Sequence, residues 1–235
     1  KRNIDAAKKL IDRLGPKDRM AILSDNVKLI VDYTNDKKVL NTGLESLKRK
    51  AGASRREYST FFVALYELFT EEDIWPIVVF QASGDEVVLL KPMWESFRKY
   101  CHRGIKDFCE RDFSFSDVME TVERSRATIY AIVPQPRVVG LSRTEQIAKA
   151  HMILDGFSDE IHWRKDEKEK AEFRRIWEEI TVEEAVAMQT GLIKITDLSG
   201  GFTDFLEKPE DVDDIYNSIF KVVENRYVIG YYPKN

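Results

Sequence analysis

A short apolar run, residues 77–80 (IVVF), constrains the fold more than any other feature of the chain. It shows no alternation of polar and apolar residues, which is typical of a parallel strand buried on both faces of a sheet. Small and acidic residues follow at once, over residues 81–85 (QASGD). Because ligands of open α/β sheets bind at the carboxyl ends of the strands, the pattern predicts a strand that opens onto a ligand-binding crevice.

Helix and strand patterns alternate along most of the chain. Apolar residues at helical spacing predict helices over residues 4–14, 36–47, 60–69, 116–125 and 212–223. Apolar and β-branched runs predict strands over residues 19–24, 27–33, 77–80, 128–133, 192–196 and 226–232. The alternation predicts a three-layer α/β fold with a doubly wound, mostly parallel sheet, helices on both faces and one antiparallel hairpin near the start.

The 235 residues are expected to form a single domain, with residues 91–114 and 136–180 as helical insertions. A capping box of Thr181 and Glu184 predicts a separate short helix that ends at Gly191, just before the strand at 192–196. A doubly wound sheet normally opens with its central strand, but this sequence opens with a helix. We therefore expect the first strand to be missing from it.

The net charge of −4 gives no bulk attraction to nucleic acid, and no apolar stretch approaches the roughly 20 residues that span a bilayer. We expect no nucleic-acid partner and no membrane insertion by this segment. One basic cluster is a candidate for an acidic partner or a phosphate, or is simply a solvated loop. It comprises Lys48, Arg49, Lys50, Arg55 and Arg56.

Two cysteines, Cys101 and Cys109, allow three interpretations. They form a disulfide in an oxidising compartment, or remain as two reduced, part-buried thiols. With His102 and either His151 or His162 they could also ligate zinc, although their spacing matches none of the usual paired-ligand patterns. Aromatic residues of the insertions are candidate contact anchors or core residues, namely Trp94, Phe97, Tyr100, Phe173 and Trp177.

The order of several segments resembles the von Willebrand factor A (VWFA) domain, in particular a bacterial VWFA-related branch. The segments that carry the resemblance are NIDAAKKLIDRLGPKDRMAIL, VKLIVDYTNDKKVLNTGLESL, PIVVF, ATIYAIV, GLIKITDLSGGF and DVDDIYNSIFKVVENRYVIGYYP. The resemblance implies a Rossmann-like fold and a metal-ion-dependent adhesion site, in which Ser, Thr and Asp side chains hold Mg²⁺ for a partner's carboxylate. It also implies a missing first strand that ends in Asp-x-Ser-x-Ser.

Carried over residue by residue, the implied site is degenerate. The first motif has no counterpart here, and Ser59 or Thr60 stands at the position of the Thr ligand, unless both are helix caps. The third motif falls on Gln81, Ala82 and Ser83 or, slipped by one, on Ala82, Ser83 and Gly84, so the coordinating Asp is absent. Asp85 would replace it only by reaching back, and is otherwise a solvated turn residue beside Gly84.

These patterns predict a non-enzymatic, protein-binding domain of the adhesion type, without a cofactor, whose binding crevice contains Ser59, Thr60, Gln81, Ala82, Ser83, Gly84 and Asp85. The alternative is a Mg²⁺-dependent domain with Ser59, Thr60 and Asp85 as ligands, completed by residues upstream of Lys1. A hydrolase on a doubly wound sheet is less favoured, because no nucleophile elbow, P-loop or dinucleotide motif occurs. The resemblance further implies a periplasmic or extracellular location.

Overall fold

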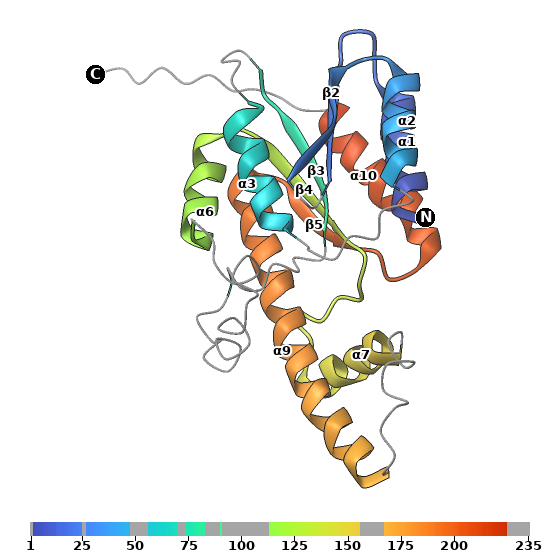
Figure 1. The fold of residues 1–235 in the computed structure, drawn as a ribbon, viewed down its shortest axis with the longest axis vertical. Coiled ribbons are helices and arrows are strands. Elements are labelled where there is room, and N and C mark those ends of the chain that lie inside the picture. Colours follow the sequence, from blue (N-terminus) through green and yellow to red (C-terminus); the bar gives the residue numbers. More distant parts are fainter. Residues whose placement is uncertain are drawn as a thin grey trace, which may run out of the picture.

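A computed structural model describes residues 2–24, 27–47, 56–69, 74–82, 90, 113–155 and 167–224. Within these ranges the chain is a mixed α/β protein with two sheets, one antiparallel with two strands and one parallel with three. The α/β class predicted from the sequence is confirmed at this level. Figure 1 shows the two sheets with helices around them.

The amino-terminal unit is a helical pair packed on a β-hairpin. It contains α1 (Arg2–Arg13), β1 (Met20–Ser24), β2 (Lys28–Thr34) and α2 (Lys37–Leu47). β1 and β2 pair antiparallel, as the sequence predicted, and Val27 beside their connection has a positive φ of 58°. Ile11, Val31 and Leu40 are the centre of a small core between the hairpin and the two helices.

The second unit is a parallel sheet with the strand order β3-β4-β5. Its strands are β3 (Ile77–Gln81), β4 (Thr128–Val133) and β5 (Phe202–Phe205). Val79 of β3 lies opposite Tyr130 of β4, which in turn lies opposite Phe202 of β5. Every residue of the central strand β4 is buried, as its continuous apolar pattern predicted.

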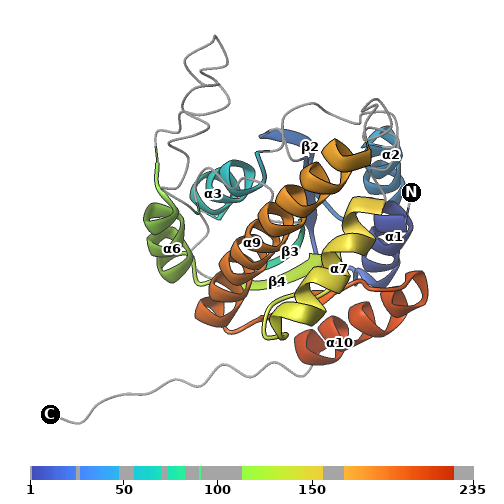
Figure 2. The ribbon, with the colours of Figure 1, turned by 90° about the horizontal axis from the view of Figure 1, so that it is seen from below.

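Helices cover both faces of the parallel sheet. One face carries α3 (Glu57–Glu67), α6 (Phe115–Arg124) and α9 (Glu167–Ser199), whose apolar side chains pack on Ile129, Ala131 and Val133. Tyr130 and Ile132 point to the opposite face, where they contact α10 (Val212–Glu224), which follows the short 3-10 helix η2 (Pro209–Asp211). α1 packs against both α2 and α10 and so joins the hairpin unit to this second layer (Figure 2).

α6 begins with a complete capping box. The Ser114 hydroxyl accepts from the Asp117 N–H, and the Asp117 carboxylate accepts from the Ser114 N–H at 2.6 Å. Hydrogen bonds from the Ser114 backbone and then from its hydroxyl hold the pKa of Asp117 below its ordinary value. The sequence pattern that predicts a helix over residues 116–125 makes Ser116 its cap. The cap is instead Ser114, because Ser114 is the residue with a carboxylate three positions ahead.

The predicted short helix ending at Gly191 and the predicted strand at 192–196 are both wrong. α9 runs unbroken through this region, with Met188, Leu192 and Ile195 buried at helical spacing. Gly191 lies inside the helix and does not end it. Its role is close packing against α3, because a Cβ at this position would lie 2.8 Å from the Tyr58 hydroxyl. The third parallel strand is instead β5, entered through Gly200 and Gly201.

The protruding part of the molecule consists of α7 (Arg143–Asp155) and the first half of α9, which lie side by side (Figures 1 and 2). His151 of α7 lies 2.7 Å from the Glu178 carboxylate of α9. The disulfide and zinc interpretations rest on Cys101 and Cys109, which lie outside the described residues together with His102 and His162. Residues 91–112 of the predicted insertion at 91–114 and the predicted strand at 226–232 also lie outside them.

Candidate functional site

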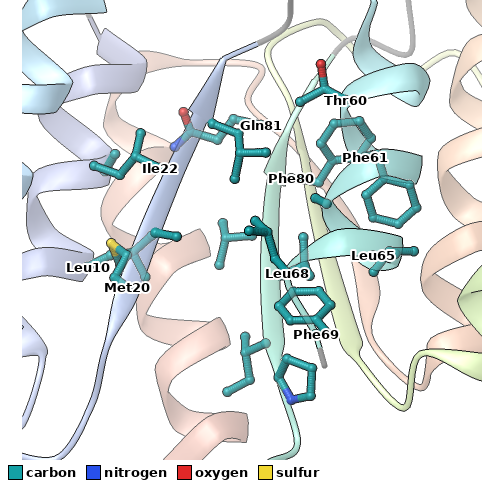
Figure 3. Close-up of a pocket in the computed structure, with 18 of the residues that line it drawn as sticks. Leu10, Met20, Ile22, Thr60, Phe61, Leu65, Leu68, Phe69, Phe80 and Gln81 are labelled. Atoms are coloured by element: carbon teal, nitrogen blue, oxygen red, sulfur yellow. The ribbon is translucent and has the colours of Figure 1, made fainter. Parts of the chain in front are cut away.

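The carboxyl ends of the parallel strands meet near the amino-terminal end of α3. Five residues of this region line one end of a large cavity of about 1630 Å³, and we call them the carboxyl-edge crevice: Thr60, Gln81, Ala82, Pro134 and Gln135. Thr60 and Gln81 lie at the same end of the cavity (Figure 3). The sequence-predicted residues Ser59, Thr60, Gln81 and Ala82 are therefore brought together, whereas Ser83, Gly84 and Asp85 lie outside the described residues.

Thr60 joins α3 to the β-hairpin. Its hydroxyl accepts a hydrogen bond from the Val27 N–H at 2.9 Å and donates one to the Ser24 carbonyl at 3.1 Å. A hydroxyl has one donor and two acceptor lone pairs, so one lone pair is left for a ligand. Ser59 is buried beside it, in the first turn of the same helix. The helix begins after Arg56, and no side chain caps it there.

Gln81 at the end of β3 faces the opposite helical layer. Its Nε2 donates to the Tyr216 hydroxyl of α10. Burial raises the pKa of Tyr216 to about 12, against a smaller opposing effect of this hydrogen bond. Gln81 thus fixes the end of β3 to α10 and presents a neutral side chain at the carboxyl edge.

Ala82 continues the β3 backbone beyond the strand, because its N–H donates to the Ile132 carbonyl at 3.2 Å. The residue is 2% exposed. In one of the two registers implied by the family resemblance, this is the position of the coordinating Asp. A buried methyl group stands there instead, and it offers no oxygen to a cation.

Gln135 is the residue of the crevice that the sequence reasoning missed. It is the second residue after β4, between Pro134 and Pro136, and its Oε1 atom is buried without a hydrogen-bond partner. A buried acceptor left unpaired costs about 1–3 kcal/mol, so this carbonyl is a preferred point for a donor from a ligand. A polar residue held between two prolines at the end of a strand is the sequence pattern that would have identified it.

Glu57 was also missed. It lies in the first turn of α3, lines the same cavity and is only 8% exposed. Buried carboxylates are rare unless they are paired, and Glu57 does have an interaction of its own. It brings a carboxyl group to the α3 side of the crevice.

A charged group borders the crevice beyond β5. The Glu207 carboxylate accepts from the Lys149 ammonium at 2.8 Å and from the Arg137 N–H at 3.2 Å. The hydrogen bond from Lys149, more than any other contact, lowers the pKa of Glu207. These contacts tie the loop after β4 to α7 and to the end of β5, and so fix the neighbourhood of Gln135.

No three His, Cys, Asp or Glu side chains among the described residues come together as a metal site would require. Each helix in the described ranges is too short or too polar to cross a lipid bilayer. Comparisons with protein-family models, with curated proteins and with solved structures found no match.

Proposed function

We propose that this chain is a VWFA-like domain that binds a protein partner at the carboxyl-edge crevice, without enzymatic activity and without a metal ion as its principal contact. The finer fold is part of the proposal: the hairpin and the parallel sheet belong to one doubly wound, Rossmann-like sheet, in the order β2-β1-gap-β3-β4-β5. The cavity between β1 and β3 supports this order, since it occupies the place of one central strand (Figure 3).

The unpaired carbonyl of Gln135 is the observation that carries the binding proposal. It lies at the strand ends, where ligands of α/β sheets bind, and lines the same cavity as Thr60 and Gln81. These groups are neutral and can hydrogen-bond, which suits a peptide backbone or a polar side chain of a partner. An N–H donor from that partner would satisfy Gln135.

Metal-free recognition is supported by two contacts. Ala82 places a methyl group at one of the two possible positions of the acidic ligand, and the Thr60 hydroxyl, bonded to the backbone on both sides, offers only one neutral lone pair. Mg²⁺ prefers several hard oxygen ligands in octahedral geometry. Titration of Mg²⁺ and Mn²⁺ followed by calorimetry should therefore give no saturable heat at micromolar concentrations.

Partner binding can be tested by immobilising the chain and quantifying captured proteins by mass spectrometry. Gln135→Leu removes the unpaired carbonyl at similar volume and should reduce capture of a specific partner at least severalfold, while Thr42→Val on the exposed face of α2 should leave it unchanged. Equal capture by both variants would contradict the assignment of the crevice. Turnover of generic phosphatase or esterase substrates would contradict the non-enzymatic proposal.

One observation favours a second candidate, a Mg²⁺-dependent form of the same site. Glu57 brings a buried carboxylate to the first turn of α3, near Ser59 and Thr60. Saturable Mg²⁺ binding that is lost in both Glu57→Gln and Asp85→Asn would establish this candidate. Binding lost in neither variant would place the ion elsewhere.

A further inference from the structure

The cavity that ends in the crevice continues as a groove between the two sheets. β1 lines one side through Met20–Ser24, and β3 lines the other through Ile77–Gln81. In the part of the chain that the structure describes, β1 pairs only with β2, and β3 pairs only with β4. Two strand edges therefore face each other across the groove without a ladder between them (Figure 3).

The two edges run in the same direction. Thr60 is bonded to Ser24 at the carboxyl end of β1, and it lies at the same end of the groove as Gln81, the last residue of β3. Met20, the first residue of β1, lies farther from Thr60 and Gln81 than Ile22 does, toward the opposite end of the groove (Figure 3). An extended segment in the groove could thus pair in parallel with both strands at once.

Apolar side chains cover the groove on both faces. α3 and its C-cap contribute one cover, through Phe61, Leu65 and Leu68. α1 and α10 contribute the other, through residues such as Leu10 and Phe220. A strand held between two such layers needs apolar side chains on both of its faces. The groove therefore selects an extended segment without the alternation of a half-exposed strand.

We propose that residues 226–232 of this chain (RYVIGYY) occupy the groove as its central strand, whatever partner binds at the crevice. One face of such a strand would present Tyr227, Ile229 and Tyr231. The other would present Arg226 at the entrance, followed by Val228, Gly230 and Tyr232, so both faces are apolar or aromatic beyond the first residue. Seven residues of strand extend about 23 Å, enough to span the five-residue strand β3.

The position of α10 brings this segment to the correct end of the groove. α10 follows β5, starts near the carboxyl edge and runs back toward the amino ends of the strands (Figure 1). Phe220 and Val223 in its last turns line the groove, and α10 ends at Glu224. Only Asn225 separates it from Arg226, so the segment would enter at the amino end and run parallel to β3.

Hydrogen exchange read by mass spectrometry tests the proposal in the full chain and in a variant that ends at Glu224. Removing the segment should speed exchange in peptides that cover β1 and β3 by an order of magnitude or more, because the outer edges lose their hydrogen bonds. Peptides from β4, which is paired on both sides, should change far less. A synthetic peptide of residues 225–235 should restore protection, and a scrambled peptide should not. Identical exchange of β1 and β3 in both chains would overturn the proposal.

A pair of full-length variants keeps the test decisive if the shortened chain fails to fold. Ile229→Lys places a charge inside the proposed strand and should deprotect β1 and β3, whereas Lys234→Glu, beyond the strand, should not. Equal exchange in these variants would overturn the proposal. The wild-type chain should also keep the same protection of β1 and β3 when it is diluted. A loss of protection on dilution would overturn the proposal, because the groove would then hold the segment of a second copy.

Discussion

β3 and β4 have similar apolar sequences and different surroundings. β4 is paired on both edges and buried at all six positions, whereas β3 is paired on one edge and none of its five residues is fully buried. Ile77 at the start of β3 remains 38% exposed. Similar apolar sequences therefore do not give similar burial. The number of neighbouring strands determines how much of each strand is shielded from solvent.

The largest effect is expected from Gly201→Ala, which disrupts the packing around β4. A Cβ at this position would overlap the carbonyl oxygen of Ile129, a backbone atom that cannot rotate away. We expect a loss of about 3 kcal/mol or more in the free energy of unfolding, measured with urea. Gly15→Ala is the control, because its Cβ would meet only the flexible Asp18 carboxylate, at 3.1 Å. Equal losses in the two variants would contradict this account.

Valine-to-alanine substitutions in the two strands compare how strongly each strand is buried. In a chain that ends at Glu224, Val133→Ala in β4 should cost about 2.5 kcal/mol, through lost burial and a cavity, and Val79→Ala in β3 only about 1 kcal/mol. The reason is that Val133 is fully buried and Val79 is not. In the full chain, where the strand proposed for the groove would cover β3, the loss for Val79→Ala should rise toward that for Val133→Ala. Similar losses in the shortened chain, measured by urea unfolding, would contradict the comparison.

Thr60→Val tests how the hairpin is held against α3 beside β3. It preserves the shape of the side chain but leaves the Val27 N–H and the Ser24 carbonyl without this partner, so we expect a loss of about 1.5 kcal/mol. Thr42→Val removes only an exposed bond to the Lys38 carbonyl and should cost about 0.5 kcal/mol or less. Thermal unfolding of both variants checks this, and a reversed order would be incompatible with the role assigned to Thr60.

The smallest effect is confined to alkaline pH and concerns the link from β3 to α10. The pKa of Tyr216 is about 12 in the folded chain, above its ordinary value of 10.0. Between these values the unfolded chain loses the phenol proton and the folded chain keeps it, so stability should fall as pH rises from 10 toward 12. Tyr216→Phe should show a shallower decline in urea unfolding over this interval; an unchanged slope would rule out Tyr216 as its source.

Local patterns predicted most elements, because they concern contacts that the elements themselves define. The stripe of α10, the buried run of β4 and the hairpin of β1 and β2 all follow from spacing alone. Residues 192–196 (LIKIT) were mistaken for a strand because β-branched residues favour strands, whereas burial of Leu192 and Ile195 under the sheet favours the helix. Tertiary packing, rather than local propensity, determined the helical structure of this segment.

The candidate site was only partly predictable for a similar reason. The family resemblance, rather than the order of the elements, implied that Thr60 and Gln81 would meet at the carboxyl edge. It could not reveal that Gln135 has a buried, unpaired carbonyl or that Gln81 donates to Tyr216, because both depend on which loops and helices meet. Such contacts join residues far apart in the chain.

The length of α9 gives the molecule a hydrodynamic signature. Its 33 residues extend about 50 Å, while the six residues of β4 extend about 20 Å. The helix runs close to the long axis of the particle (Figure 1). Its amide bonds point along that axis and reorient mainly by slow end-over-end tumbling. Nuclear spin relaxation should therefore report a longer apparent correlation time for α9 amides than for amides in the strands.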